Sequence, residues 1–222
     1  MGFFYCILEL SISQIIRFMN LFSEIRDEKE NILPFDGIVN YYGVCIPFDE
    51  ANRYYDKLLQ HLAWKRDLVV MFGKRIETKR KVAWYGDRTY KYTYSNNTKL
   101  ALPWNEVLME IKELTEQITG ESYNSCLANL YHDGSEGMAW HSDNEKELKV
   151  NGAIASLSFG AERRFSFKHK VKNNKVSIIL EHGSLLLMKG TTQKHWLHRL
   201  PPTKKQFTPR VNLTFRNIID HP

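Results

Sequence analysis

Short apolar runs alternate with polar turns over the second half of the chain, from Ser125 onwards. Runs that alternate with a period of two residues are typical of β-strands, and no helical pattern connects them. Many short strands without crossover helices favour an antiparallel sandwich or jelly roll over a parallel sheet. The strand-like runs read CLANLYH, AIASLSF, RFSFKH, VSIILE, SLLLMK and VNLTFRNI.

Two helices are expected before these strands. The clearer helix begins after Asn105, a favourable N-cap, and stops at Gly120. An earlier helix is expected after Asp49, which can cap it. The apolar stripes comprise Val107, Leu108, Ile111, Leu114 and Ile118 in the first case, and Tyr55, Leu58, Leu59 and Leu62 in the second. Alternating aromatic-rich segments between the helices (VVMFGKR, KVAWYGD and YKYTYS) predict β-hairpins, so the expected fold class is α+β.

We expect one compact unit with three parts: an N-terminal extension over residues 1–33, a helix and β-hairpin region over 34–104, and the jelly-roll core over 105–222. The extension is apolar, but it lacks the basic start of a signal peptide because no Lys or Arg precedes Arg17. Glu9 and Arg17 also interrupt any uncharged run of the ~18 residues that a membrane span requires. We expect a docked amphipathic helix, or an extension that precedes a start at Met19. The protein is then neither secreted nor membrane-bound, but cytoplasmic in a bacterium or nuclear in a eukaryote.

Composition narrows the class of protein further. With 43% hydrophobic and 25% charged residues, the 222-residue chain is that of a globular protein and not of a disordered one. Its three cysteines are far apart and form no CxxC pair, which argues against a disulfide scaffold and a thiolate zinc site. The net charge of +6 favours polyanionic partners weakly.

Polar residues share one face of a strand near the C-terminus, within PRVNLTFRNI. Val211, Leu213 and Phe215 face one way, and the residues between them face the other. Those residues are Arg210, Asn212, Thr214 and Arg216. Two guanidiniums near a β core carry a desolvation penalty unless an anion meets them. Either this face is a carboxylate or phosphate cradle, or the strand is exposed and carries ordinary surface arginines.

His141 and Asp143 form an HxD pair after a glycine-rich turn. Residues two apart in an extended chain point the same way, so this imidazole and this carboxylate converge. Two imidazoles and one carboxylate bind Fe(II) and leave three positions open. His195 and His198 lie downstream as candidates for the second imidazole, although each is also compatible with a packed or surface histidine.

The order of HxD, a distant His and two Arg on one strand face resembles the AlkB family of iron- and 2-oxoglutarate-dependent nucleic-acid dealkylases, from about Pro34 to Ile219. It is most similar to the DNA-repair branch that carries an aromatic finger. The resemblance implies a double-stranded β-helix (jelly roll) core, a nucleotide-recognition region over 34–104, an Fe(2+) cofactor, and 2-oxoglutarate and O2 as co-substrates. The matching strings are VMFGKR, KRKVAWYGD, YTYS, NLYHDGSEGMAWHSDNEKEL, ASLSFGAERRFSF, HGSLLLMKG, HWLHRLP and PRVNLTFRNI.

The family pattern, carried over position by position, implies site residues of three kinds. The iron ligands would be His141, Asp143 and His198, the last because it precedes the RLP turn and lies twelve residues before Arg210. The 2-oxoglutarate pocket would comprise Asn129, Tyr131, Arg210, Asn212, Thr214 and Arg216. The substrate contacts would comprise Phe72, Gly73, Lys74, Arg80, Tyr92, Tyr94, Asn144 and Glu145.

Within the substrate set, Phe72 matches a finger residue that fills the gap left by an extruded base, although a core aromatic is the alternative. Tyr94 matches the aromatic that stacks on that base, and Tyr92 shares its face. Asn144 departs from an acidic residue common at its position. Lys204 and Lys205 follow the RLP turn and are expected either to touch phosphate or to lie in a solvated loop.

The resemblance implies oxidative demethylation of alkylated bases, such as 1-methyladenine and 3-methylcytosine in DNA, with release of formaldehyde. The expected partner is alkylated DNA, single- or double-stranded, bound by a monomer. One alternative is an oxygenase that acts on RNA or on a protein side chain. Another is a metal-free jelly roll that binds nucleic acid without chemistry, although the complete ligand set disfavours it.

Overall fold

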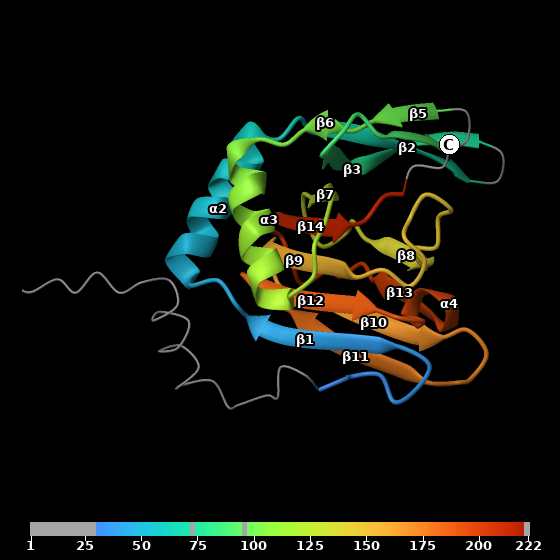
Figure 1. Ribbon diagram of the computed structural model, residues 1–222. Helices are drawn as coiled ribbons and strands as arrows, with labels where there is room; N and C mark the ends of the chain where they lie inside the picture. Colours follow the sequence, from blue (N-terminus) through green and yellow to red (C-terminus); the bar gives the residue numbers. More distant parts are fainter. Residues whose placement is uncertain (1–29, 72–73, 95–96, 220–222) are drawn as a thin grey trace, which may run out of the picture.

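The computed structural model describes residues 30–71, 74–94 and 97–219, and it describes side chains except those of residues 68–76 and 91–99. The predicted extension therefore lies outside the described residues up to position 29. Two β-sheets face each other, and two helices cover the outer face of the larger sheet (Figure 1). This is the jelly-roll arrangement that the strand pattern predicts.

The larger sheet has eight strands, and it contains both segments predicted to belong to the core and segments of the region over 34–104. Every pair in it is antiparallel except that of β6 (Leu102–Pro103) with β3. The order along the sheet is β1 (Ile38–Val44), β12 (Ser184–Lys189), β9 (Ile154–Gly160), β14 (Arg210–Arg216), β7 (Ser125–Tyr131), β3 (Lys74–Gly86) and β2 (Lys65–Met71). Because β1 and β3 pair with core strands, the two regions share one sheet.

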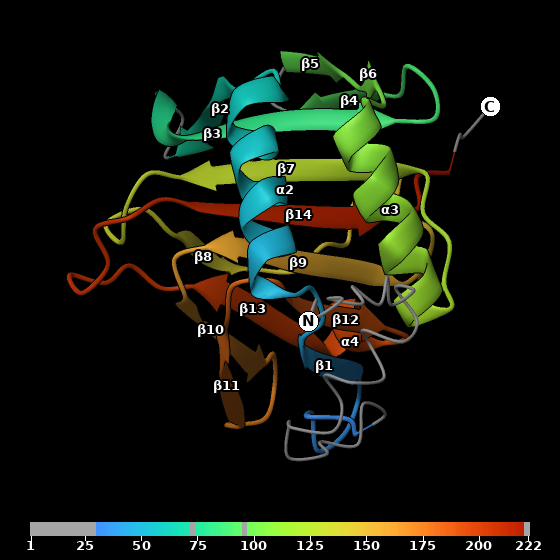
Figure 2. The same ribbon diagram turned by 90° about the vertical axis from the view of Figure 1, so that its left-hand side faces the viewer.

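The smaller sheet closes the other side of the sandwich. Its order is β11 (Lys175–Leu180), β10 (Arg163–His169), β13 (Trp196–Leu200) and β8 (Met138–His141). A separate two-stranded sheet, β4 (Lys91–Tyr94) with β5 (Asn97–Leu100), lies near the end of the larger sheet formed by β3 and β2, as Figure 2 shows. Among the described residues, no helix is long and apolar enough to span a membrane.

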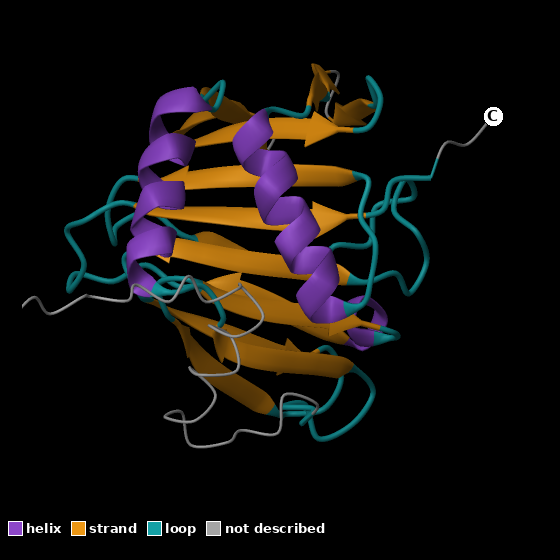
Figure 3. Ribbon diagram, turned by 60° about the vertical axis from the view of Figure 1, so that its left-hand side comes forward, coloured by secondary structure: helices purple, strands orange, loops and turns teal. Residues whose placement is uncertain are grey.

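Helices α2 (Phe48–His61) and α3 (Glu106–Thr119) run across the larger sheet (Figures 2 and 3). Helix α3 matches its prediction: the Asn105 side chain accepts a hydrogen bond from the Leu108 N–H at 3.0 Å, and Gly120 ends the helix at φ +67°. The prediction that Asp49 caps α2 is wrong. The cap position is Pro47, without a side-chain hydrogen bond, and Asp49 lies in the first turn, where a carboxylate favours the helix dipole.

Two clusters of apolar side chains make up the core. The first lies between the helices and the larger sheet, where Val211, Leu213 and Phe215 are fully buried. The second lies between the two sheets at their β1 and β11 end, around Phe167 and Trp196. A further cavity between the sheets is lined by both polar and apolar side chains, and it contains the predicted site residues of β14.

Candidate active site

Two neighbouring strands of the smaller sheet bring the predicted metal ligands together. His198 on β13 is the register partner of His141 on β8, and their ring centroids are 4.3 Å apart. Asp143 follows β8 by two residues, and its Oδ1 lies 3.7 Å from Nε2 of His141 and 3.9 Å from Nε2 of His198. The three side chains thus offer ligand atoms that all lie within 4.8 Å of one another.

The surroundings keep these three groups ready to bind a cation. Nδ1 of His141 lies 2.8 Å from the Ala139 carbonyl oxygen, which can only accept, so Nδ1 carries the proton and Nε2 presents a lone pair. Burial lowers the pKa of His198 to about 4, so that imidazole is neutral at physiological pH. Although burial disfavours its ionisation, Arg216 and the two imidazoles hold the pKa of Asp143 below its usual value.

Sequence reasoning missed one residue that holds this triad in place. Gln193, in the four-residue helix α4 (Thr192–His195), accepts a hydrogen bond from the backbone N–H of Asp143 at 2.9 Å. Helix α4 has no counterpart among the predicted helices, because one turn is too short to show a periodic pattern. The only signal available was its position a few residues before His198.

The polar face of β14 points into the space between the sheets, as a cradle requires. Arg210, Asn212 and Thr214 are buried, and Arg216 is half-buried. All four line one cavity with His141 and His198, and the predicted Asn129 and Tyr131 of the neighbouring strand β7 line it too. The structure therefore brings together all six residues that the resemblance implies for the 2-oxoglutarate pocket. The alternative of an exposed strand with surface arginines is wrong.

The two guanidiniums of this cavity differ in their partners. Arg210 donates to the Ser158 hydroxyl at 2.9 Å, and its guanidinium carbon lies 5.5 Å from the centroid of the Tyr131 ring. Burial lowers the pKa of Arg210 to about 10, which still leaves it charged at neutral pH. Arg216 forms an ion pair with Asp143 at 2.9 Å. The Nε atoms of both arginines are buried without a hydrogen-bond partner, so donors remain for an anionic ligand.

Arg80, predicted to contact substrate, lies inside the structure. It is buried, forms an ion pair with Asp67 at 2.6 Å, and donates a hydrogen bond to the Asn129 side chain. Its guanidinium therefore orients one residue of the predicted co-substrate pocket. A contact with nucleic acid stays a prediction.

Asn144 and Glu145 line a second and larger cavity, of about 450 Å³, which reaches Asp143 and Arg216. Burial raises the pKa of the Glu145 carboxyl, and its Oε2 atom is buried without a hydrogen-bond partner. A buried acceptor without a donor can bind a donor from a ligand. Arg216 lines both cavities, so the predicted substrate residues and the predicted co-substrate pocket meet at the metal ligands.

The remaining predicted substrate contacts are not described in full. Phe72 and Gly73 lie outside the described residues, between β2 and β3 in the sequence. Lys74 begins β3, and Tyr92 and Tyr94 lie in β4, but their side chains lie outside the described residues as well. Their roles stay predictions.

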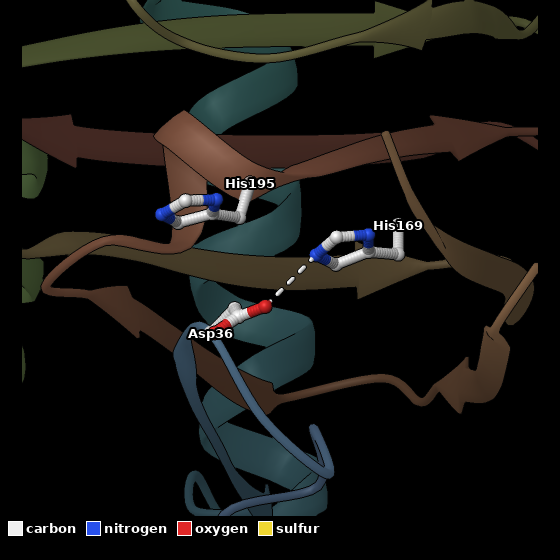
Figure 4. Close-up of side chains that lie close together, drawn as sticks. All are labelled: Asp36, His169 and His195. Carbon is white, nitrogen blue, oxygen red and sulfur yellow. Dashed lines mark ion pairs between the residues drawn. The ribbon is translucent and has the colours of Figure 1, made fainter. Parts of the chain in front are cut away.

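A second cluster of His and Asp side chains contains His195, the alternative candidate for the distal ligand. His195 lies with Asp36 and His169 (Figure 4), in a group that does not include His141 or Asp143. Nδ1 of His169 accepts hydrogen bonds from the Val171 and Lys172 N–H groups at 3.2 and 2.8 Å. The proton of the neutral ring is therefore on Nε2, which points to Asp36 at 3.2 Å. A metal ligand needs the opposite tautomer, so this cluster orders a turn and does not fit a metal ion.

Comparison with known proteins agrees with this geometry. The 2OG-Fe(II) oxygenase superfamily model matches residues 23–216, and the chain belongs to this superfamily. Within it, the chain belongs to the AlkB family. The human and bovine proteins named DNA oxidative demethylase ALKBH2 are 41% and 40% identical to it over 179 residues, which cover 77% of this chain. The chain spans 69% of the human relative and 64% of the bovine one.

A solved structure titled "The structure of OsALKBH1" has the same fold. Its TM-score is 0.58, it is 16% identical, and the match covers 83% of this chain and 99% of that chain. Family membership implies Fe(II) with 2-oxoglutarate and O2, and the described side chains fit them. His141, Asp143 and His198 supply the two nitrogens and one oxygen of an open ferrous site, and Arg210 and Arg216 supply the cationic pocket beside it.

Proposed function

We propose that the chain is an Fe(II)- and 2-oxoglutarate-dependent dioxygenase that removes methyl groups from alkylated bases in DNA. One observation carries the proposal: His141 and His198 of the triad line one cavity with Arg210 and Arg216, and the Nε atoms of both arginines are buried without a hydrogen-bond partner. The names of the ALKBH2 relatives, DNA oxidative demethylase, support the choice of reaction and substrate.

When bound, iron and 2-oxoglutarate would couple oxidative decarboxylation by O2 to hydroxylation of a methyl group on a base nitrogen, and the product would lose formaldehyde to restore the base. The chain's own residues bind and orient. Arg216 reaches the carboxylate of Asp143, so it can hold an acid group next to the metal ligands. Arg210, buried deeper beside Tyr131, can bind an acid group further away. A dicarboxylate matches a pocket with a guanidinium toward each end.

The larger cavity suits an extruded base. 1-Methyladenine and 3-methylcytosine each carry an amino group beside the methylated nitrogen, and the Glu145 carboxyl has a buried oxygen without a donor. Methylation of this edge weakens base pairing, so such a base costs less to extrude. We propose that the Glu145 carboxyl accepts a hydrogen bond from that amino group. We also propose that the protein acts as a monomer. RNA is the alternative substrate.

The proposal is tested with single- and double-stranded oligonucleotides that carry different alkyl lesions, supplied with Fe(II), ascorbate and 2-oxoglutarate and analysed by mass spectrometry. We expect loss of the methyl mass from 1-methyladenine and 3-methylcytosine strands. If no DNA lesion loses mass while a methylated RNA or peptide does, the assignment of substrate is wrong.

A further inference from the structure

The loop between β13 and β14 presents an aromatic ring to solvent. Phe207 is 83% exposed, and among the described residues its ring contacts no other ring. Phe48, the other strongly exposed phenylalanine of the described residues, does make an edge contact, with His182 at 5.6 Å. Lys204 and Lys205 shortly precede Phe207, and residues 201–209 contain no acidic side chain. An exposed aromatic therefore stands in a locally cationic loop.

The loop that carries Phe207 is held by backbone hydrogen bonds to a neighbouring turn. The Gly134 N–H donates to the Gln206 carbonyl at 2.8 Å, and the Gly134 carbonyl accepts from the Thr203 N–H at 2.7 Å. A Cβ at Gly134 would lie 2.3 Å from the Thr203 oxygen, so backbone packs directly on backbone. Prolines at 201, 202 and 209 restrict the loop further. These backbone contacts and prolines hold the loop in a defined shape.

One buried side chain joins this loop to the turn that precedes β8. Arg163, only 2% exposed, donates through Nη2 to the Glu136 carbonyl at 2.8 Å and to the Pro201 carbonyl at 2.9 Å. Its Nη1 donates to the Asp133 carbonyl at 3.3 Å. The two Nη atoms of this guanidinium therefore donate to backbone oxygens of both segments, which holds the segments together.

The loop also lies beside the predicted co-substrate pocket, because Leu200 and Arg210, which flank the loop in sequence, both line that cavity. The loop connects the strand of His198 with the strand that begins at Arg210. The turn it packs on, residues 132–137, follows β7, and β7 pairs with β3 through Leu130 and Lys81. Figure 2 shows the loop after β7 and the loop before β14 at the same edge of the molecule. Strand β3 leads from there to the predicted finger, so the loop lies at the edge where a substrate strand would run.

We propose that Phe207 stacks on an unpaired base of the substrate strand while Lys204 and Lys205 contact the neighbouring phosphates. This inference rests on the proposed function, because it takes a nucleic-acid strand as the partner. Cationic side chains beside an exposed aromatic are how proteins bind single strands without reading sequence, since every base has a face to stack on. The fixed loop would bind at low conformational cost.

The test measures binding of labelled single strands by fluorescence anisotropy, one strand with normal bases and one with an abasic backbone of the same length. We expect Phe207→Ala to weaken binding of the base-containing strand by about 5- to 150-fold. Binding of the abasic strand should not change, because its phosphates remain. Phe207→Trp should bind both strands as the wild type does.

Two controls separate stacking from other effects. Phe48→Ala removes an equally apolar exposed ring from the helix side of the molecule and should leave both affinities unchanged (Figure 1). Lys204→Gln should weaken both strands alike and reduce the salt dependence of binding. Equal loss on both strands for Phe207→Ala, no loss on either, or a change in oligomeric state by analytical ultracentrifugation would overturn the stacking assignment. Because these are binding measurements, they give an answer even if demethylation fails.

Discussion

Asp143 is the residue on which the site depends most, because it is buried between two imidazoles and a guanidinium. Asp143→Asn removes the anionic ligand and leaves Arg216 without its partner. We expect Fe(II) affinity to fall by more than about 100-fold. This is a larger loss than is typical when a residue that only orients a metal ligand is replaced. Anaerobic calorimetry measures this, with Asp56→Asn on the exposed side of α2 as the matched control. Unchanged iron affinity would remove Asp143 from the metal site.

Arg210→Lys keeps the charge of the cationic pocket but removes its forked donors. We expect the KM for 2-oxoglutarate to rise by roughly 10- to 150-fold, the equivalent of one charge-assisted hydrogen bond of about 1.5–3 kcal/mol. Steady-state succinate formation measures it. Arg53→Lys, an exposed arginine on α2, should have no effect. A KM that stays at the wild-type value would mean that 2-oxoglutarate does not bind at Arg210.

The single-residue predictions succeeded where chemistry and spacing were both distinctive. His141 and Asp143 stand two apart, and their side chains do converge. Arg80 shows the limit, because its sequence position gives no sign that its guanidinium is buried against Asp67 and Asn129. Partners from distant segments decide where a long side chain points, and those partners are set only by the fold.

At the scale of elements, the cap of α3 offers a test of the fold's local energetics. Asn105→Ala removes the side-chain acceptor for the Leu108 N–H. We expect the free energy of unfolding to fall by about 1 kcal/mol without loss of activity, because the helix lies on the outer face of the sheet. Urea titration measures the stability. Asn105→Asp should restore most of it, and an alanine variant as stable as the wild type would contradict the role of the cap.

Element predictions failed where the pattern was short. Strand β14 was evident because seven residues alternate between core and cavity. Strands β8 and β13, which carry both histidine ligands, did not appear among the predicted apolar runs. They have four and five residues and carry polar or half-buried side chains toward the site. Periodicity weakens where residues serve a site and not the core, so the strands nearest the chemistry are the hardest to predict.

At the scale of the whole molecule, binding of metal and 2-oxoglutarate should stabilise the fold, since the two histidine ligands lie on the smaller sheet and the residues of the 2-oxoglutarate pocket on the larger one. With Mn(II) as a redox-inert substitute and 2-oxoglutarate, each held at about 100 times its dissociation constant, we expect roughly 2.7 kcal/mol of stabilisation per ligand. Thermal unfolding followed by circular dichroism measures it. The Asp143→Asn variant should show no stabilisation by Mn(II). An equal gain in that variant would mean that the metal binds elsewhere.

The fold class followed from local patterns, whereas the assembly of the site did not. The regular spacing of strands and the lack of crossover helices indicated a jelly roll. Those patterns could not predict that His198 lies beside His141. The two residues are far apart in the sequence, and only the pairing of β13 with β8 in the smaller sheet brings them together. The choice of His198 over His195 came from resemblance, and the register of β13 with β8 places His198 beside His141.

Formaldehyde release from a 1-methyladenine oligonucleotide, measured together with succinate, tests the catalytic triad in the wild type and in Asp143→Ala loaded under identical conditions. Assignment of the triad as the catalytic centre predicts that the wild type forms both products and that the variant forms neither above the level without enzyme. Formaldehyde release at the wild-type rate by the variant would contradict it.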